Sequence, residues 1–342
     1  ASLNRIELGP DDRAKLLAEY ETMLELLGGG FESACASPGV PPKDRSRQAA
    51  TLYRNLWQEM TMGWKIALVS KLEKRSFFSS GKADPYFVQR VLNGYWQLFR
   101  AGCRLYLPMP SGAWSEIHQM FRLGAENEFL DEPSEPKNRS IATTYKRILL
   151  LSLADVLRFA PEEQDKVIEI VENYAHLAHF LPLTKQPVAA GQLDSSASQA
   201  ILLETEELST HLHRAEAIIE SKAPQANDRA KVLARLQILR RTNRQWTIAP
   251  QRTYQRIASH AMVDIIFSLR ALVAQLNDGE LPPEPAEAET DDQPASRPIR
   301  IAMSKWQVLN ESPGGFALRS VSIDSEQVRA GDLRSEERRV GK

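Results

Sequence analysis

Two short groups of polar residues near the C-terminal end of the chain have types and spacing suited to ligand chemistry. Arg252 and Arg256 are four residues apart and precede a β-branched and aromatic run, and Asn310, Ser312 and Gly315 stand where a later strand is expected to turn. A guanidinium group can fork onto phosphate oxygens, bond the edge of guanine or stack on a base. Amide and hydroxyl groups bond base edges, and glycine lets the backbone approach a ligand closely or adopt a positive φ.

Together these residues resemble the signature of the PilZ domain family, Arg-x-x-x-Arg followed by (Asp/Asn)-x-Ser-x-x-Gly. The resemblance covers about 246–333, roughly a quarter of the chain. It implies a small β-barrel and, because known members are commonly receptors for cyclic di-GMP, it implies this dinucleotide as a regulatory ligand, with no other cofactor. Carried over position by position, it makes the ligand-binding set Arg252, Arg256, Asn310, Ser312 and Gly315, with Gln251 and Arg270 as neighbours of unassigned role.

Two features depart from the family pattern. Arg256 and Asn310 are 54 positions apart, so a helix and a linker must be inserted between the first two strands. Such an insertion is tolerable because loop-closure cost grows only logarithmically with length. Strands that would close the barrel are missing up to Leu333, so we expect an open sheet edge. Each motif alone also has a plain alternative, a solvated helix face for the two arginines and an ordinary β-turn for the second group.

The elements expected around these motifs form a β domain over 246–333. Strands are indicated at 262–267, 299–309 and 316–323, a helix at 269–276 and a turn at Pro313-Gly314-Gly315. An acidic, proline-rich insert at 277–298 cannot bury enough apolar area to order itself. The final residues, 334–342, we interpret as a non-native tail, with a basic solvated natural tail as the alternative.

The preceding residues, 1–245, predict an all-α domain, so the fold class is mainly α. Apolar residues recur at three- and four-residue steps, with a break expected at Gly28-Gly29-Gly30. Tryptophans and neighbouring aromatics in the first 130 residues predict a core, with a partner groove as the alternative. The expected helices begin at Pro10 and continue over 44–74, 85–105, 112–129, 141–159, 161–181, 202–222 and 228–245.

Composition limits the classes of function. With 43 basic and 44 acidic residues the formal net charge is -1, which argues against nucleic-acid wrapping or attraction to anionic lipid. Two cysteines without metal-type spacing indicate a reducing cytoplasm. The longest apolar stretch, at 148–153, is far shorter than a spanning helix, so no membrane insertion is expected. The chain lacks an initiator Met, which suggests a piece of a longer protein.

Other chemistry has weaker support. His176 with His179, and His211 with His213, could suggest a metal, but no Cys or carboxylate completes a set. No nucleophile elbow or phosphate-binding loop is present, so we predict no enzyme. The leading hypothesis is a bacterial signalling adaptor that binds cyclic di-GMP and transmits occupancy to a helical effector domain with an unknown protein partner or a homodimer. The alternatives are a ligand-independent helical scaffold and an enzyme hidden in the helical domain.

Overall fold

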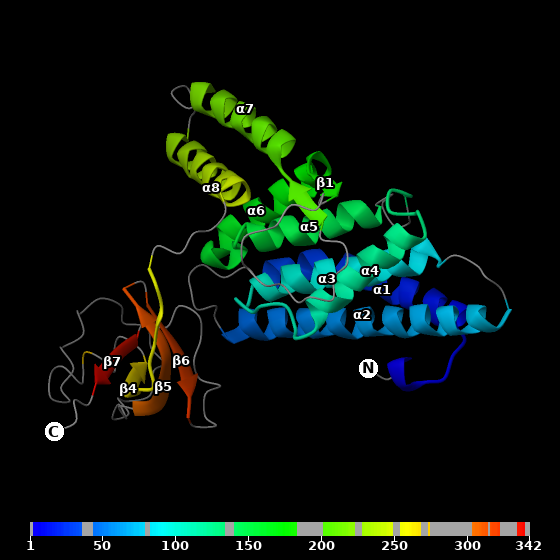
Figure 1. Ribbon diagram of the computed structural model, residues 1–342, viewed down its shortest axis with the longest axis horizontal. Helices are drawn as coiled ribbons and strands as arrows, with labels where there is room; N and C mark the ends of the chain where they lie inside the picture. The colour runs from blue at the N-terminus through cyan, green and yellow to red at the C-terminus, as the bar shows by residue number, and fades with distance from the viewer. Residues whose placement is uncertain are drawn as a thin grey trace, which may run out of the picture. The chain divides into compact units, whose positions relative to one another are not determined.

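The computed structural model describes the chain in segments, and these are mainly helical. Across the described residues, eight α-helices precede a small antiparallel sheet (Figure 1). The chain divides into two units, Ala1–Pro250 and Gln251–Lys342. The described residues are 3–35, 44–78, 83–133, 140–182, 201–222, 228–248, 254–267, 273, 303–313, 315–321 and 334–338.

Three long helices carry most of the core of the first unit: α1 (Pro10–Cys35), α2 (Asp44–Phe78) and α3 (Pro85–Cys103). Helix α3 is buried around almost its whole circumference, as expected of a central helix. Asp84 caps its start by accepting a hydrogen bond from the backbone N–H of Tyr86, and Pro85 occupies the first helical position. The helices lie side by side, with α2 packed against both neighbours (Figure 1).

The aromatic core predicted for this unit is confirmed. Trp57, Trp64 and Trp96 are 1%, 0% and 0% exposed, so they cannot line a partner groove. Trp114 is half-buried and packs against the same core.

The expected break at Gly28–Gly30 is wrong, because α1 continues through these residues to Cys35. Gly28 is buried, and a Cβ there would lie 3.5 Å from the Tyr53 hydroxyl of α2. Glycine in a helix costs about 1 kcal/mol relative to alanine. Packing of the long apolar face against α2 offsets that cost, since tertiary contacts supply most helical stability in proteins.

Three shorter helices complete the middle of the unit: α4 (Ala113–Glu126), α5 (Ile141–Leu153) and α6 (Pro161–Tyr174). Short 3₁₀ turns occur at Leu3–Arg5, Val156–Arg158 and Ala175–Leu177.

Two of the expected helices are wrong at one end. Strand β1 (His179–Pro182) pairs with β2 (Ile201–Glu204) in an antiparallel ladder, where helix had been expected. Short apolar runs do not distinguish strand from helix, and this pairing joins residues 19 to 25 positions apart.

The last two helices, α7 (Glu206–Lys222) and α8 (Arg229–Thr247), lie side by side (Figure 1). The indole N–H of Trp246 donates a hydrogen bond of 2.9 Å to the carbonyl of Leu150, which ties the end of α8 to α5. Among the described residues, no helix combines the length and apolar character needed to cross a membrane.

The second unit contains β3 (Ile257–Ala258), β4 (Met262–Phe267), β5 (Met303–Ser312), β6 (Gly315–Ser320) and β7 (Arg334–Arg338). β5 pairs with β3 and β4 along one edge and with β6 along the other, and β4 pairs further with β7. The strands expected at 262–267, 299–309 and 316–323 are thus represented by β4, β5 and β6. Val263, Ile265, Trp306 and Val308 form an apolar cluster, against which Leu318 packs.

Residues 334–338, expected to belong to a tail, form β7 on the outer edge of β4. Pairing does not depend on the origin of a segment, so the non-native interpretation stays a prediction. Apart from Val273, the expected helix at 269–276 and the acidic insert at 277–298 lie outside the described residues. The extent of the β domain and its closure into a barrel also stay predictions.

Candidate functional site

The segment that contains β3 and β4 runs antiparallel along β5 and carries an extra residue. Ala258 pairs with Asn310, and the next strand pair is Met262 with Gln307. From one pair to the next, the β3–β4 segment advances four residues and β5 advances three. The β3–β4 segment therefore has a bulge at 259–261. Backbone hydrogen bonds continue through it, from Ser259 N–H to the Leu309 carbonyl at 3.1 Å and onward from Val308 to Ala261.

The opposite edge of β5 has a second irregularity. Val308 pairs with Leu318, whereas Asn310 pairs with Ala317, so β5 carries one extra residue, Leu309, relative to β6. A β-bulge of this kind shifts the side on which the following side chains project.

The bulge decides which face of the sheet carries the predicted polar residues. Leu318 packs against the apolar cluster, and side chains alternate along β6, so Ala317 and Gly315 lie on the opposite face. Their partners Asn310 and Ser312 share that face, because directly paired residues project to the same side. In a regular strand without the bulge, residues 308 and 310 would share a face, and Asn310 would lie on the apolar side with Val308.

Arg256 reaches the same place from the other edge. Ile257 pairs with Glu311 and Ala258 with Asn310, so continuing this register by one residue places Arg256 beside Ser312. Arg256 is exposed and lies just outside β3 in a non-helical segment, so the alternative of a solvated helix face is wrong at this position. We call the set Arg256, Asn310, Ser312 and Gly315 the outer-face corner.

The outer-face corner has the open geometry that a ligand site needs. Asn310 and Ser312 are half-buried, and the Ser312 hydroxyl donates a hydrogen bond of 3.4 Å to the Gly315 carbonyl. Gly315 has φ +138°, and nothing lies within 4 Å of the position that a Cβ would take. The residues that carry the hydroxyl, amide and guanidinium groups are thus neighbours in register, and no described atom occupies the position beside Gly315 that a Cβ would take.

Two alanines that the sequence analysis did not single out also shape this site. Ala258 and Ala317 flank Asn310 on both sides, in direct register. Both alanine side chains end at a methyl group, so neither stands taller than the Asn310 amide between them, and we call the row Ala258–Asn310–Ala317 the trough. Only the pairing of β3 and β6 with β5 reveals these neighbours, so no local sequence signal identifies them.

Four of the five predicted binding residues thus come together at one corner of the sheet. Arg252 lies outside the described residues, as do Gln251 and Arg270.

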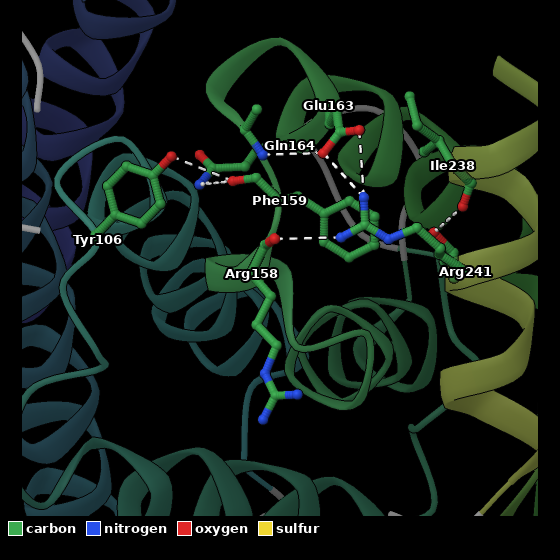
Figure 2. Close-up of polar contacts among 9 residues, drawn as sticks. Tyr106, Arg158, Phe159, Glu163, Gln164, Ile238 and Arg241 are labelled. Carbon is green, nitrogen blue, oxygen red and sulfur yellow. Dashed lines mark hydrogen bonds and ion pairs between the residues drawn. The ribbon is translucent and has the colours of Figure 1, made fainter. Parts of the chain in front are cut away.

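Helix α8, which precedes the predicted arginine arm in the chain, is fastened to the rest of the helical unit by Arg241. Its guanidinium lies 4.1 Å from the centre of the Phe159 ring and donates hydrogen bonds to both oxygens of Glu163, at 3.2 and 3.3 Å (Figure 2). A further hydrogen bond of 3.2 Å reaches the Arg158 carbonyl. Glu163 also accepts from the backbone N–H of Ala160 at the start of α6. Arg241 therefore clamps α8 to the α5–α6 corner.

The α5–α6 corner that receives Arg241 is held from its other side as well. The Tyr106 hydroxyl and the Gln164 amide both donate to the Phe159 carbonyl, each at 3.2 Å (Figure 2). Arg104 donates to the Pro161 carbonyl at 3.3 Å and pairs with Asp165. The surface that receives α8 is thus built from several independent contacts.

The histidines considered as metal ligands have other neighbours. His179 pairs with Glu207 at 2.7 Å, the ring of His211 packs 4.8 Å from that of Tyr174, and His213 faces Glu216. Within the described segments, no group of three or more His, Cys, Asp or Glu side chains is placed to hold a metal ion.

A small cleft in the helical unit bears on the idea of a hidden enzyme. It has a volume of about 30 Å³ and lies among α2, α3 and α6, with Arg100, Arg104 and Asp165 as its ionisable lining residues. Asp165 is engaged by Arg104, so the acid in this cleft is part of a structural ion pair.

Comparison with known proteins places the chain in a family. The family described as "Cyclic-di-GMP receptor FimW, N-terminal domain" matches residues 1–187, more than half of the chain. The cyclic-di-GMP receptor FimW of Pseudomonas aeruginosa is 21% identical over 297 aligned residues, covering 79% of this chain and 48% of the relative. The chain thus spans about half the length of that curated relative. No solved structure matches. Through its N-terminal domain, the chain belongs to the family of the cyclic-di-GMP receptor FimW.

Proposed function

We propose that this protein is a bacterial cyclic di-GMP receptor that binds the dinucleotide in a PilZ-like β domain and performs no catalysis. The observation that carries the proposal is the outer-face corner, where Arg256, Asn310, Ser312 and Gly315 converge although the chain between Arg256 and Asn310 is long. Membership of the FimW family supports the same ligand class, because the matched relative is described as a receptor for it.

The chemistry of the corner suits a ligand with two phosphates and two guanines. Arg256, with Arg252 from the same arm, would form charge-assisted hydrogen bonds to phosphate oxygens or to guanine edges. Asn310 and Ser312 would bond polar atoms of the bases, and Gly315 would let the ligand approach the hairpin backbone.

The proposed output is a change in the helical unit that a protein partner reads. The arginine arm follows α8 directly in the chain, and α8 is held by Arg241 and Trp246. Ordering of the arm around a ligand would bias the attachment of α8, provided that its two arrangements differ in ligand affinity. A micromolar ligand has a standard binding free energy of about -8 kcal/mol, enough to shift an equilibrium of a few kcal/mol.

A second candidate function is a ligand-independent helical scaffold. It is favoured by the location of the family match at residues 1–187, which places the family likeness on the helical unit rather than on the β domain. The alignment with the Pseudomonas aeruginosa receptor covers more of the chain than this segment, which favours the receptor.

Isothermal titration calorimetry of the full chain with cyclic di-GMP separates these functions. We expect saturable binding that weakens about tenfold or more in Arg256→Ala, because a hydrogen bond to a charged group contributes about 1.5–3 kcal/mol. Ser312→Ala should weaken it about twofold to tenfold, because a hydrogen bond between neutral groups contributes about 0.5–1.5 kcal/mol. Arg229→Ala, on the exposed face of α8, is the matched control and should bind as the wild type does. Absence of binding by the wild-type chain, or equal binding by all variants, would discard the receptor and favour the scaffold.

A further inference from the structure

The outer face of the sheet carries a second arginine that belongs to neither sequence motif. Arg319 is exposed and lies on β6, paired with Gln307. Its neighbour Leu318 packs against the apolar cluster, so Arg319 projects to the same face as the outer-face corner.

The strand register places this arginine close to the trough. Asn310 pairs with Ala317, so Arg319, two residues farther along β6, is a diagonal neighbour of Asn310. On the other edge Asn310 pairs with Ala258, so Arg256 is the diagonal neighbour there. Diagonal neighbours in a sheet are about 7–8 Å apart, within reach of long side chains. Arg256 and Arg319 therefore flank Asn310 from opposite strands and from opposite ends of the trough.

The charges around the trough favour an anion. Glu311 lies between Asn310 and Ser312 in β5 and so projects to the opposite face. Asp264 lies on the outer face beyond Gln307, paired in register with Lys305 on one side and with Glu337 on the other. Along the stretch of β5 from Gln307 to Ser312, the charged side chains on the described outer face are those of Arg256 and Arg319. A rigid ligand with two separated anionic groups suits a pair of cations on either side of a small amide side chain.

We propose that Arg319 is an additional ligand-contacting residue, which binds a phosphate of the cyclic dinucleotide across the trough from Arg256. This inference rests on the proposed function. Because Ala258 and Ala317 carry only methyl groups, they leave room for a ligand to lie over Asn310 and meet both guanidinium groups. Arg319 then contributes to affinity through charge and through the forked geometry of its guanidinium group.

The test is calorimetric titration of the full chain with cyclic di-GMP at several salt concentrations. We expect Arg319→Gln to weaken binding about tenfold, as for loss of one hydrogen bond to a charged group, and to reduce the dependence of affinity on salt. Arg319→Lys keeps the charge but not the fork, so it should fall between the wild type and Arg319→Gln. Lys305→Gln removes an exposed cation from the same face, beyond Gln307, and should bind within about twofold of the wild type, as expected of a screened surface charge.

The outcomes separate this inference from the proposed function. If the wild type binds and Arg319→Gln binds equally well with the same salt dependence, the role of Arg319 is overturned and the receptor stands. Equal weakening by Lys305→Gln would also overturn it, since the effect would then be a general one of net charge. No binding by the wild type would overturn both. Thermal unfolding of each variant shows whether an observed loss comes from unfolding, and binding measured below the melting transition keeps the comparison valid.

Discussion

Ala258 lies directly opposite Asn310 across the ladder that joins β3 to β5. The side chain directly beside the Asn310 amide on that side is therefore a single methyl group. Ala258→Leu should fill this space and weaken cyclic di-GMP binding at least tenfold by steric exclusion, with no charge removed, because over-filled sites cost about 1–3 kcal/mol. Calorimetry measures the effect. Ile257→Leu, one position away on the opposite face, is the control, and equal affinity in both variants would show that the ligand does not enter the trough.

Gly315 should be intolerant of a side chain for reasons of backbone conformation alone. Its φ is +138°, and no atom lies within 4 Å of an added Cβ, so packing does not penalise alanine there. Gly315→Ala should destabilise the β5–β6 hairpin by about 1–3 kcal/mol, the cost of a sparsely populated backbone region. Denaturant unfolding checks this. Gly29→Ala, in α1 with equally open space and no positive φ, should instead be stabilising, and a stabilised Gly315→Ala would contradict the hairpin geometry.

Arg241→Gln should loosen α8 without unfolding the helical unit. The variant loses the contact with the Phe159 ring and the hydrogen bonds to Glu163 and the Arg158 carbonyl. Because Arg241 is about half exposed, we expect a stability loss of only about 1 kcal/mol. Hydrogen exchange should accelerate selectively over 229–247. Arg244→Gln, one turn farther along α8 and exposed, is the control, and identical exchange in the two variants would show that Arg241 is no clamp.

The buried pair of Glu21 and Arg90 should be costly to break and much less costly to replace. The Arg90 guanidinium lies 2.9 Å from the Glu21 carboxylate, which also accepts from Trp64 and Asn93. Burial raises the pKa of Glu21, and the positive charge of Arg90 opposes that shift. Glu21→Leu leaves Arg90 buried without its counter-charge and should cost about 3–5 kcal/mol.

The double variant Glu21→Leu, Arg90→Met should recover most of this loss, because replacing both ions with apolar groups of similar volume is often neutral. Chemical denaturation of the two variants and the wild type gives the comparison. A double variant no more stable than Glu21→Leu would mean that the network contributes more than its charges.

His118 should make part of the stability of the helical unit dependent on pH. Burial lowers its pKa below the usual 6.5, and the positive charge of Arg122 lowers it further. The Tyr145 hydroxyl lies 2.7 Å from its Nδ1, and Trp114 stacks on the ring. The folded state thus prefers the neutral imidazole. Its contribution is present above about pH 6.5 and is lost as the pH falls through the depressed pKa.

This contribution can be isolated by comparing the wild type with His118→Phe between pH 5 and 8. The stability difference between the two should change on the acidic side and be constant above about pH 7. An NMR titration of His118 with a midpoint at or above 6.5 would rule out the expected direction.

The helices could be predicted well where their signals are local. Asp84 and Pro85 mark the start of α3, and the apolar stripes of α2 and α3 recur at helical spacing. The β1–β2 ladder could not be predicted in this way, since Phe180 and Leu203 are apolar in either conformation and their pairing joins distant parts of the chain. Gly28 misled the prediction because the packing of α1 against α2, which keeps the helix continuous, is a tertiary feature.

For the candidate site, the residue types could be recognised but not the direction in which they project. Arg256, Asn310 and Ser312 stand out by type and spacing, whereas their shared face depends on bulges that only strand pairing reveals. Arg319 was missed for the same reason. The local sequence around Leu318 and Arg319 does not indicate to which face of a sheet the arginine projects.

The site depends on the extra residue at Leu309. A change in the hairpin that made β5 pair regularly with β6 through Leu309 would turn Asn310 and Ser312 over to the hydrophobic side, while every motif residue stayed present in the translated sequence. A homologue with such a regular ladder would therefore keep the sequence motif but lose its arrangement on the outer face. A search for the sequence motif alone would not detect this difference.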